Sequence, residues 1–220
     1  SPAYVADPAL SLSFKQELTT ERFPVFTSHT PSGVTSVPLA FMTEWFGLGA
    51  LHANPGLTLH GIDDLRLFED VPVTPEGKTI RLMSGKARKV KGLFEVDVEI
   101  RNGVRSGLEF VHSKAKAVLG ETPAPPPAFS GDPLLDTPDG SRSTEVVYGL
   151  PPFSNVGLKG IHKVTKIDAN GAVAEIGSAP PPEKWMQEPL RNHWIADPLA
   201  IEAAFQLLSL WGFEQKGAFY

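Results

Sequence analysis

An enclosed helix is the feature that most constrains the fold of this chain. Residues 38–52 predict a helix that begins at a proline suited to the first turn and ends before Asn54-Pro55-Gly56. This segment, PLAFMTEWFGLGALH, is apolar on nearly every side. A helix of that kind is wrapped by other structure rather than laid on a surface, so the rest of the chain must supply a sheet around it.

Strand-like segments stand on both sides of this helix. Residues 10–18 alternate apolar and polar side chains at their start, which predicts a strand. Turn signals such as Lys91-Gly92 and Asn102-Gly103 separate four further segments: 57–69, 78–90, 93–101 and 107–119. Their lengths and tight turns favour an antiparallel meander. One strand, one buried helix and long strands that wrap it describe a hotdog unit, an α+β architecture.

A proline-rich segment divides the chain into 1–120, a linker at 121–142, and 143–220. The linker mixes Pro with Gly, Ser and Asp, and it should be semi-rigid where the prolines cluster. Beyond it the order of elements returns, with strands expected at 143–148, 157–167 and 172–176, followed by a helix. We therefore predict a double hotdog in which the order of elements repeats and the sequence does not.

The second hotdog is incomplete in this chain. Nine residues follow Trp211 in the second helix, whereas a full unit would continue with roughly 60 to 90 residues of sheet. We expect the remaining strands to come from another segment of the protein, from a partner in a homodimer, or from sequence beyond Tyr220. The alternative is that the second half is not a hotdog.

Composition excludes several classes of function. The net charge is -5 and Lys and Arg are spread thinly, so neither a nucleic-acid nor an anionic-lipid footprint is present. The absence of Cys excludes disulfides, thiolate catalysis and cysteine zinc sites. The histidines lack HxH or HExxH spacing, so no metal site is expected. Neither a signal peptide nor an 18-residue apolar segment is recognisable, and we expect a cytoplasmic protein without a membrane partner.

The second predicted helix carries a polar stripe. It begins at Asp197-Pro198, an N-cap followed by a proline in the first turn. Glu202, Gln206 and Ser209 then share one face of an otherwise apolar helix. This stripe is either the solvent face of an amphipathic helix or a desolvated polar site. In the second case, burial would raise the pKa of Glu202 and make it a proton donor near neutral pH.

A second motif, HxxxGxxxxP, precedes the first helix. His29 has the side chain whose unperturbed pKa suits a base at neutral pH. Gly33 allows a turn or a close approach of a substrate to the backbone, and Pro38 opens a helix whose free N–H groups can polarise a carbonyl oxygen. Such a site would suit a thioester, and an ordinary loop histidine is the alternative. Glu44, inside the first helix, is expected to be packed or at the rim, with a second acid as the alternative.

Together these motifs resemble the dehydratase domains of polyketide and polyunsaturated-fatty-acid synthases, which are double hotdogs. HxxxGxxxxP before a buried helix carries the likeness, together with a later helix that starts with Asp-Pro and bears an acid four residues before a Gln. Residues 60–68, 147–150 and 191–198 also look like segments of the family. The likeness extends over nearly the whole chain, up to about Trp211.

The resemblance implies dehydration of a 3-hydroxyacyl thioester on an acyl carrier protein to the trans-2-enoyl thioester, in polyketide or fatty-acid synthesis. His29 would remove the α-proton and Glu202, where the family has Asp, would protonate the departing hydroxyl. Partners would be the acyl carrier protein and other synthase domains. No metal or organic cofactor is implied, because the substrate arrives on the carrier's phosphopantetheine arm.

The same resemblance assigns the surrounding residues. Substrate-binding roles fall to Gly33, Val37, Pro38, Tyr148 and Gln206. The helix N-terminus near Val37 and Pro38 would stabilise the enolate-like charge, and Gln206 would hold the Glu202 carboxyl.

Apolar side chains are expected round the site, and the sequence differs from the family's pattern in two places. The side chains expected to desolvate the site are Phe41, Trp45, Ile201 and Phe205. Leu150-Pro151-Pro152-Phe153 replaces the Gly-Pro-Phe segment of the family, and Glu202 is one methylene longer than Asp. The alternatives are a catalytically silent pseudo-dehydratase that serves as a structural or carrier-docking module, and a hotdog cyclase or thioesterase.

Overall fold

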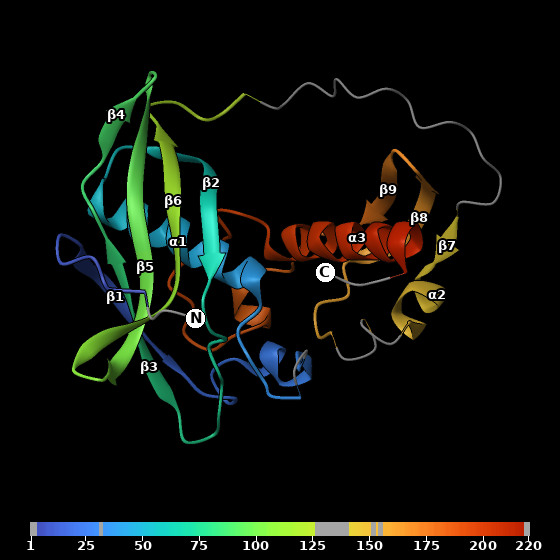
Figure 1. Ribbon diagram of the computed structural model, residues 1–220, viewed down its shortest axis with the longest axis horizontal. Coiled ribbons are helices and arrows are strands. Elements are labelled where there is room, and N and C mark those ends of the chain that lie inside the picture. The colour runs from blue at the N-terminus through green and yellow to red at the C-terminus, as the bar shows by residue number, and fades with distance from the viewer. Residues whose placement is uncertain (1–3, 31–32, 126–140, 151–152, 154–155, 218–220) are drawn as a thin grey trace.

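Two α+β units make up the chain (Figure 1). The structure is a computed structural model and describes residues 4–30, 33–125, 141–150, 153 and 156–217. One unit contains the larger antiparallel sheet and helix α1, and the other contains a smaller sheet and helix α3. The arrangement is the predicted double hotdog with a partial second unit.

The first unit is an antiparallel sheet that packs on α1, Leu39–Ala53. Its strand order is β1-β3-β5-β6-β2, and the short strand β4 pairs with β5. The strands are β1 Ser11–Leu18, β2 Thr58–Leu67, β3 Lys78–Ser84, β4 Arg88–Val90, β5 Leu93–Arg105 and β6 Leu108–Gly120. Ten of the 15 residues of α1 are buried, so the helix is enclosed as its composition predicts.

The predicted antiparallel meander is confirmed for β3, β5 and β6 and is wrong for β2. β2 and β3 follow each other in sequence, but β2 pairs with β6 at the far edge of the sheet. The chain between them runs beside the segment that precedes α1, where the Val37 N–H donates to the Val71 carbonyl and the Val73 N–H to the Thr35 carbonyl. This long connection buries Val71 and Val73, which a tight hairpin turn could not do.

Two predicted strand ends also differ from the structure. Residues 78–90 are not one strand, because they divide into β3 and β4. The turn predicted at Asn102-Gly103 is an irregularity within β5, where the register shifts and Gly103 has a φ of 63°. The reversal comes instead at Ser106-Gly107, whose φ angles are 53° and 80°.

The second unit is built round α3, Pro198–Lys216. Its sheet has the order β7-β8-β9, with β7 Arg142–Ser143, β8 Ile161–Asp168 and β9 Gly171–Ile176. The strand predicted at 143–148 is wrong, because these residues form helix α2, Thr144–Gly149. Ser143 caps this helix by accepting a hydrogen bond from the Val146 N–H. The predicted strand at 157–167 starts later, at Ile161.

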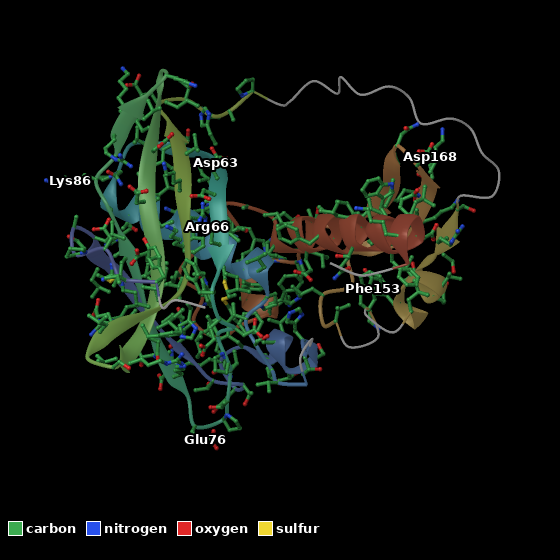
Figure 2. All side chains as sticks on the ribbon, viewed as in Figure 1. Asp63, Arg66, Glu76, Lys86, Phe153 and Asp168 are labelled. Atoms are coloured by element: carbon green, nitrogen blue, oxygen red, sulfur yellow. The ribbon has the colours of Figure 1, made fainter. Side chains whose placement is uncertain are left out.

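Two hydrophobic cores lie on either side of the junction between the units. The first encloses the apolar side chains of α1, and it also takes in Leu158 and Met186 from the second half of the chain. The second joins α2, the small sheet and α3 and includes Phe153 (Figure 2). In the C-terminal half of α3 the Trp211 indole N–H donates to the carbonyl oxygen of Asp168.

The outer face of α3 is apolar and exposed. Phe205 is 38% and Leu208 63% exposed, and β9 forms an edge of the small sheet. The origin of the further strands expected for this unit stays a prediction. None of the helices in the described ranges is long and apolar enough to cross a membrane.

Gly160 marks the close approach of the start of β8 to α3. An added Cβ would lie 2.8 Å from the Leu199 carbonyl oxygen and 2.9 Å from the Ala203 Cβ. Because helix backbone cannot rotate aside, we expect Gly160→Ala to lower the free energy of unfolding by about 1–3 kcal/mol, measured by denaturant titration. Gly61→Ala in β2 is the control, since its added Cβ would meet no atom within 4 Å. Equal losses in both variants would contradict this packing.

Candidate functional site

His29 is buried at the end of a short 3-10 helix, η1, Pro24–Ser28. Its backbone N–H donates to the Phe26 carbonyl at 2.8 Å, and its carbonyl accepts from the Ser36 N–H at 3.3 Å. The residue is 7% exposed, and its Nδ1 has no hydrogen-bond partner within the described residues. Burial lowers the pKa of His29, and the charge of Asp70 opposes this. The ring is therefore neutral at neutral pH and able to accept a proton.

Glu202 lies in α3, whose first turn is fixed by Asp197. The Asp197 carboxylate accepts from the N–H groups of Leu199 and Ala200, both at 3.0 Å, and so forms the predicted N-cap. Glu202 is 7% exposed. Burial raises its pKa, and the hydrogen bond from Gln206 opposes the rise.

The polar stripe of α3 faces inward. Glu202 and Gln206 are buried and Ser209 is half-buried, so the solvent-face interpretation of the stripe is wrong. Phe205 is exposed and therefore does not shield Glu202 as the sequence suggested. Of the other apolar side chains expected near the site, Ile201 is half-buried, and Phe41 and Trp45 are buried in the first core.

Gln206 connects Glu202 to the backbone of the second unit. Its Nε2 donates to the Leu158 carbonyl at 2.7 Å and to Glu202 Oε1 at 3.3 Å. Its Oε1 accepts from the Tyr148 hydroxyl at 2.8 Å, and that hydroxyl accepts from the Ile161 N–H at 2.8 Å. Both N–H groups of the amide are used, so the Gln206 side chain has one orientation and Glu202 is held from one side.

Gly157 and Leu158 bring His29 towards Glu202. A Cβ on Gly157 would lie 3.1 Å from the His29 backbone nitrogen, so this segment runs directly against the end of η1. The next residue, Leu158, accepts the hydrogen bond from Gln206. Gly157 and Leu158 therefore lie between the backbone of His29 and the Gln206 amide that donates to Glu202.

Gly33 lies in a turn, one of the two roles expected of it, and the Val37 amide is already engaged in a backbone hydrogen bond. Gly33 is an exposed turn residue with a φ of 78°, and no atom lies within 4 Å of an added Cβ. The Val37 N–H donates to the Val71 carbonyl at 2.9 Å, so it is not a free donor for a substrate oxygen. The close glycine contact of the site is the one at Gly157, which the sequence analysis missed.

Pro38 is the N-cap of α1 rather than its first helical residue. The helix begins without a side-chain cap. The N–H groups of Leu39 and Ala40, the first two helical residues, have no carbonyl partner within the helix, because the geometry of a first turn provides none. They are the donors that this end of α1 can offer to a carbonyl oxygen.

The structure describes Tyr148 but only part of the segment that follows it. Tyr148 is buried in α2 and bonds to Gln206, which brings it into the same network as Glu202. Phe153 is buried in the second core, whereas Pro151 and Pro152, which stand in the segment that replaces the family's Gly-Pro-Phe, lie outside the described residues. Within the described ranges, no three His, Cys, Asp or Glu side chains are grouped as metal ligands.

This chain is similar to known proteins in fold rather than in sequence. The sequence matches no protein family and no curated protein. Among solved structures, the dehydratase domain of a mycocerosic acid synthase-like polyketide synthase matches with a TM-score of 0.66 and 15% identity, over 99% of this chain and 72% of that one. A trans-AT polyketide synthase dehydratase domain from Brevibacillus brevis matches with a TM-score of 0.63 and 19% identity, over 99% and 77%.

The dehydratase domain of the polyketide PpsC from Mycobacterium tuberculosis matches with a TM-score of 0.60 and 16% identity, over 93% of this chain and 70% of that one. The chain has the fold of a polyketide synthase dehydratase domain. The resemblance inferred from the motifs is thus confirmed for the dehydratase fold. At these identities the likeness is one of fold.

The raised pKa of Glu202 predicts a pH-dependent stability. Between its ordinary value of 4.5 and the raised value, the folded chain binds more protons than the unfolded chain, so this carboxyl lowers stability as pH rises through that window. Glu202→Gln removes the effect. We expect the unfolding free energy of the variant minus that of the native chain to increase as the pH rises above about 4.5. The increase should be about 1.4 kcal/mol for each unit by which the pKa of Glu202 differs between the folded and unfolded chains.

Denaturant titrations at a series of pH values measure this difference. Glu175→Gln, at an exposed position of β9, controls for the change from acid to amide. The same pH trend in both variants would contradict the assignment to Glu202.

Proposed function

We propose that this chain dehydrates a 3-hydroxyacyl thioester to the trans-2-enoyl thioester in polyketide or fatty-acid synthesis. One observation carries the proposal. His29 is a buried base whose Nδ1 has no hydrogen-bond partner among the described residues, and its backbone lies against Gly157; the next residue, Leu158, accepts from Gln206, which also donates to the buried carboxyl with a raised pKa, Glu202, in a dehydratase fold. The fold supports the reaction class, and the two side chains support the chemistry.

The elimination needs one base and one acid. His29 takes the α-proton, the electrons of that C–H bond form the double bond between the α and β carbons, and the bond from the β carbon to oxygen breaks. Glu202 gives its proton to the departing oxygen, which leaves as water. Transfer of the proton from His29 back to Glu202 restores the starting state. The cycle uses neither an oxidant nor a cofactor.

Burial moves both pKa values in the direction that this cycle requires. The reactive state has a neutral histidine and a protonated carboxyl, and it is scarce when the pKa of the acid lies far below that of the base. Burial lowers the pKa of His29 from 6.5 and raises that of Glu202 from 4.5. Narrowing the gap in this way increases the reactive fraction near neutral pH.

Neighbouring groups provide positioning and charge stabilisation. Gln206 donates to the Glu202 carboxyl and is itself held by the Tyr148 hydroxyl. The first N–H groups of α1, from Leu39 and Ala40, replace Val37 as the donors to the thioester oxygen, on which negative charge develops when the α-proton leaves. The acyl group would be presented by an acyl carrier protein in a cytoplasmic synthase, together with other synthase domains.

A second candidate is a catalytically silent module that retains the fold. It is favoured by the hydrogen bond between the Val37 N–H and the Val71 carbonyl, which occupies an amide expected to bind substrate. Such a module would serve the synthase as a structural or carrier-docking domain.

Turnover of a 3-hydroxyacyl thioester on acyl carrier protein tests the proposal. We expect the native chain to form the enoyl thioester, which mass spectrometry detects. In both His29→Ala and Glu202→Gln, kcat should fall by about 10²–10⁴-fold, the range for loss of a general acid or base. His162→Ala and Glu175→Gln change exposed residues of β8 and β9 and should retain native turnover.

The alternatives give different products. Free acid would indicate a thioesterase, and a folded chain that leaves the thioester intact would indicate the silent module. Native turnover in either site variant would refute the assignment of His29 and Glu202.

A further inference from the structure

Glu44 is a carboxylate buried in the middle of apolar helix α1. It is 2% exposed. Its Oε1 accepts from the Ile195 N–H at 3.0 Å, and its Oε2 accepts from the N–H groups of Ile195 at 3.0 Å and Ala196 at 2.7 Å. Burial raises its pKa, and the two backbone bonds and the charge of Arg191 oppose the rise. A side chain from the first unit thus holds backbone of the second.

The backbone that Glu44 holds leads directly into α3. Ile195 and Ala196 precede Asp197, whose carboxylate accepts from two N–H groups of the first turn and from the Ala179 N–H. Two carboxylates in succession therefore fix the point at which α3 begins. Glu202 stands five residues beyond the cap, a rise of about 7.5 Å along the helix axis.

Aromatic packing also places the same segment against α1, and the Trp194 indole N–H donates to the Pro180 carbonyl at 2.7 Å. The Trp194 ring lies 5.6 Å from Phe41 and 5.7 Å from Trp185, measured between ring centroids. Such contacts are weakly directional, whereas charge-assisted hydrogen bonds to two successive N–H groups fix both distance and direction. An apolar side chain at position 44 would fill the space without the desolvation cost of a carboxylate, so packing alone does not explain a glutamate there.

We propose that Glu44 is a positioning residue, which sets α3 and the Glu202 carboxyl relative to α1 and His29. Glu44 stands one turn from the N–H groups that begin α1, so a single helix orients both the donors and the acid. The effect of Glu44 on kcat rests on the proposed function, whereas its effect on the position of α3 does not.

Glu44→Gln tests the inference because it keeps the shape but removes the charge and one acceptor. Loss of one charge-assisted bond should speed hydrogen exchange at the amides of Ile195 and Ala196 by about tenfold or more. We expect kcat to fall by at least about tenfold, with KM within about threefold of the native value, because the substrate still binds while the acid is misplaced.

Leu210→Ala is the matched control. It removes a buried side chain of α3 two turns beyond Glu202 and destabilises the helix without touching its entry. The control should retain the native kcat and native exchange at Ile195 and Ala196. If Glu44→Gln does not fold, Glu44→Asp keeps the charge but withdraws the carboxylate by one methylene, and the same results are expected.

Failure of the proposed function would leave this inference testable. NMR can follow the carboxyl carbon of Glu202 during a pH titration, and Glu202→Gln assigns its signal. We expect the titration midpoint to lie closer to 4.5 in Glu44→Gln than in the native chain, because a loosened α3 admits water. An unchanged midpoint would overturn the inference whether or not the chain is active. If the protein is active, an equal kcat in Glu44→Gln and Leu210→Ala would also overturn the inference.

Discussion

The hydrogen bonds of the Gln206 amide hold the candidate site together. One N–H of the amide goes to Leu158, whose neighbour Gly157 lies against the backbone of His29, and the other goes to Glu202. The amide oxygen is occupied by Tyr148. With every polar group of the amide engaged, the carboxyl of α3 and the loop beside His29 cannot move independently.

Burial gives this arrangement its chemical character. A histidine and a glutamate in water have pKa values that keep the first a weak base and the second ionised at neutral pH. Enclosure between the two cores disfavours the charged form of each, so that His29 becomes more fully neutral and Glu202 holds its proton to higher pH. The double-hotdog fold therefore keeps most of the solvent away from these two side chains.

Local sequence patterns predicted much of this fold. The enclosed helix α1, most strands and the capped start of α3 follow from periodicity, proline positions and the Asp197 cap, all of which act within a few residues. The neighbour of β2 depends on contacts with β6, far along the chain, and was predicted wrongly. A strand was expected at 143–148, but the Ser143 cap and the burial of Val147 and Tyr148 stabilise a helix there.

The candidate residues could be named from the sequence, whereas their geometry could not. Spacing placed Glu202 and Gln206 on one face of a helix, but periodicity does not tell whether that face points inward. The amide that bonds to Val71 and the carbonyl of Leu158 are backbone groups, which carry no sequence signal. Gly157 was visible as a glycine, but its contact with His29 needs the three-dimensional fold.

Proximity of positions 29 and 202 is the central claim, and the chain is well suited to a direct test because it contains no cysteine. His29→Cys combined with Glu202→Cys can be treated with a short bifunctional thiol reagent, and the linked peptides measured by mass spectrometry after proteolysis. We predict an efficient cross-link in this pair and none when His29→Cys is combined with Glu175→Cys on β9. Failure of the 29–202 pair to link, in a folded protein whose thiols both react singly, would contradict a shared site.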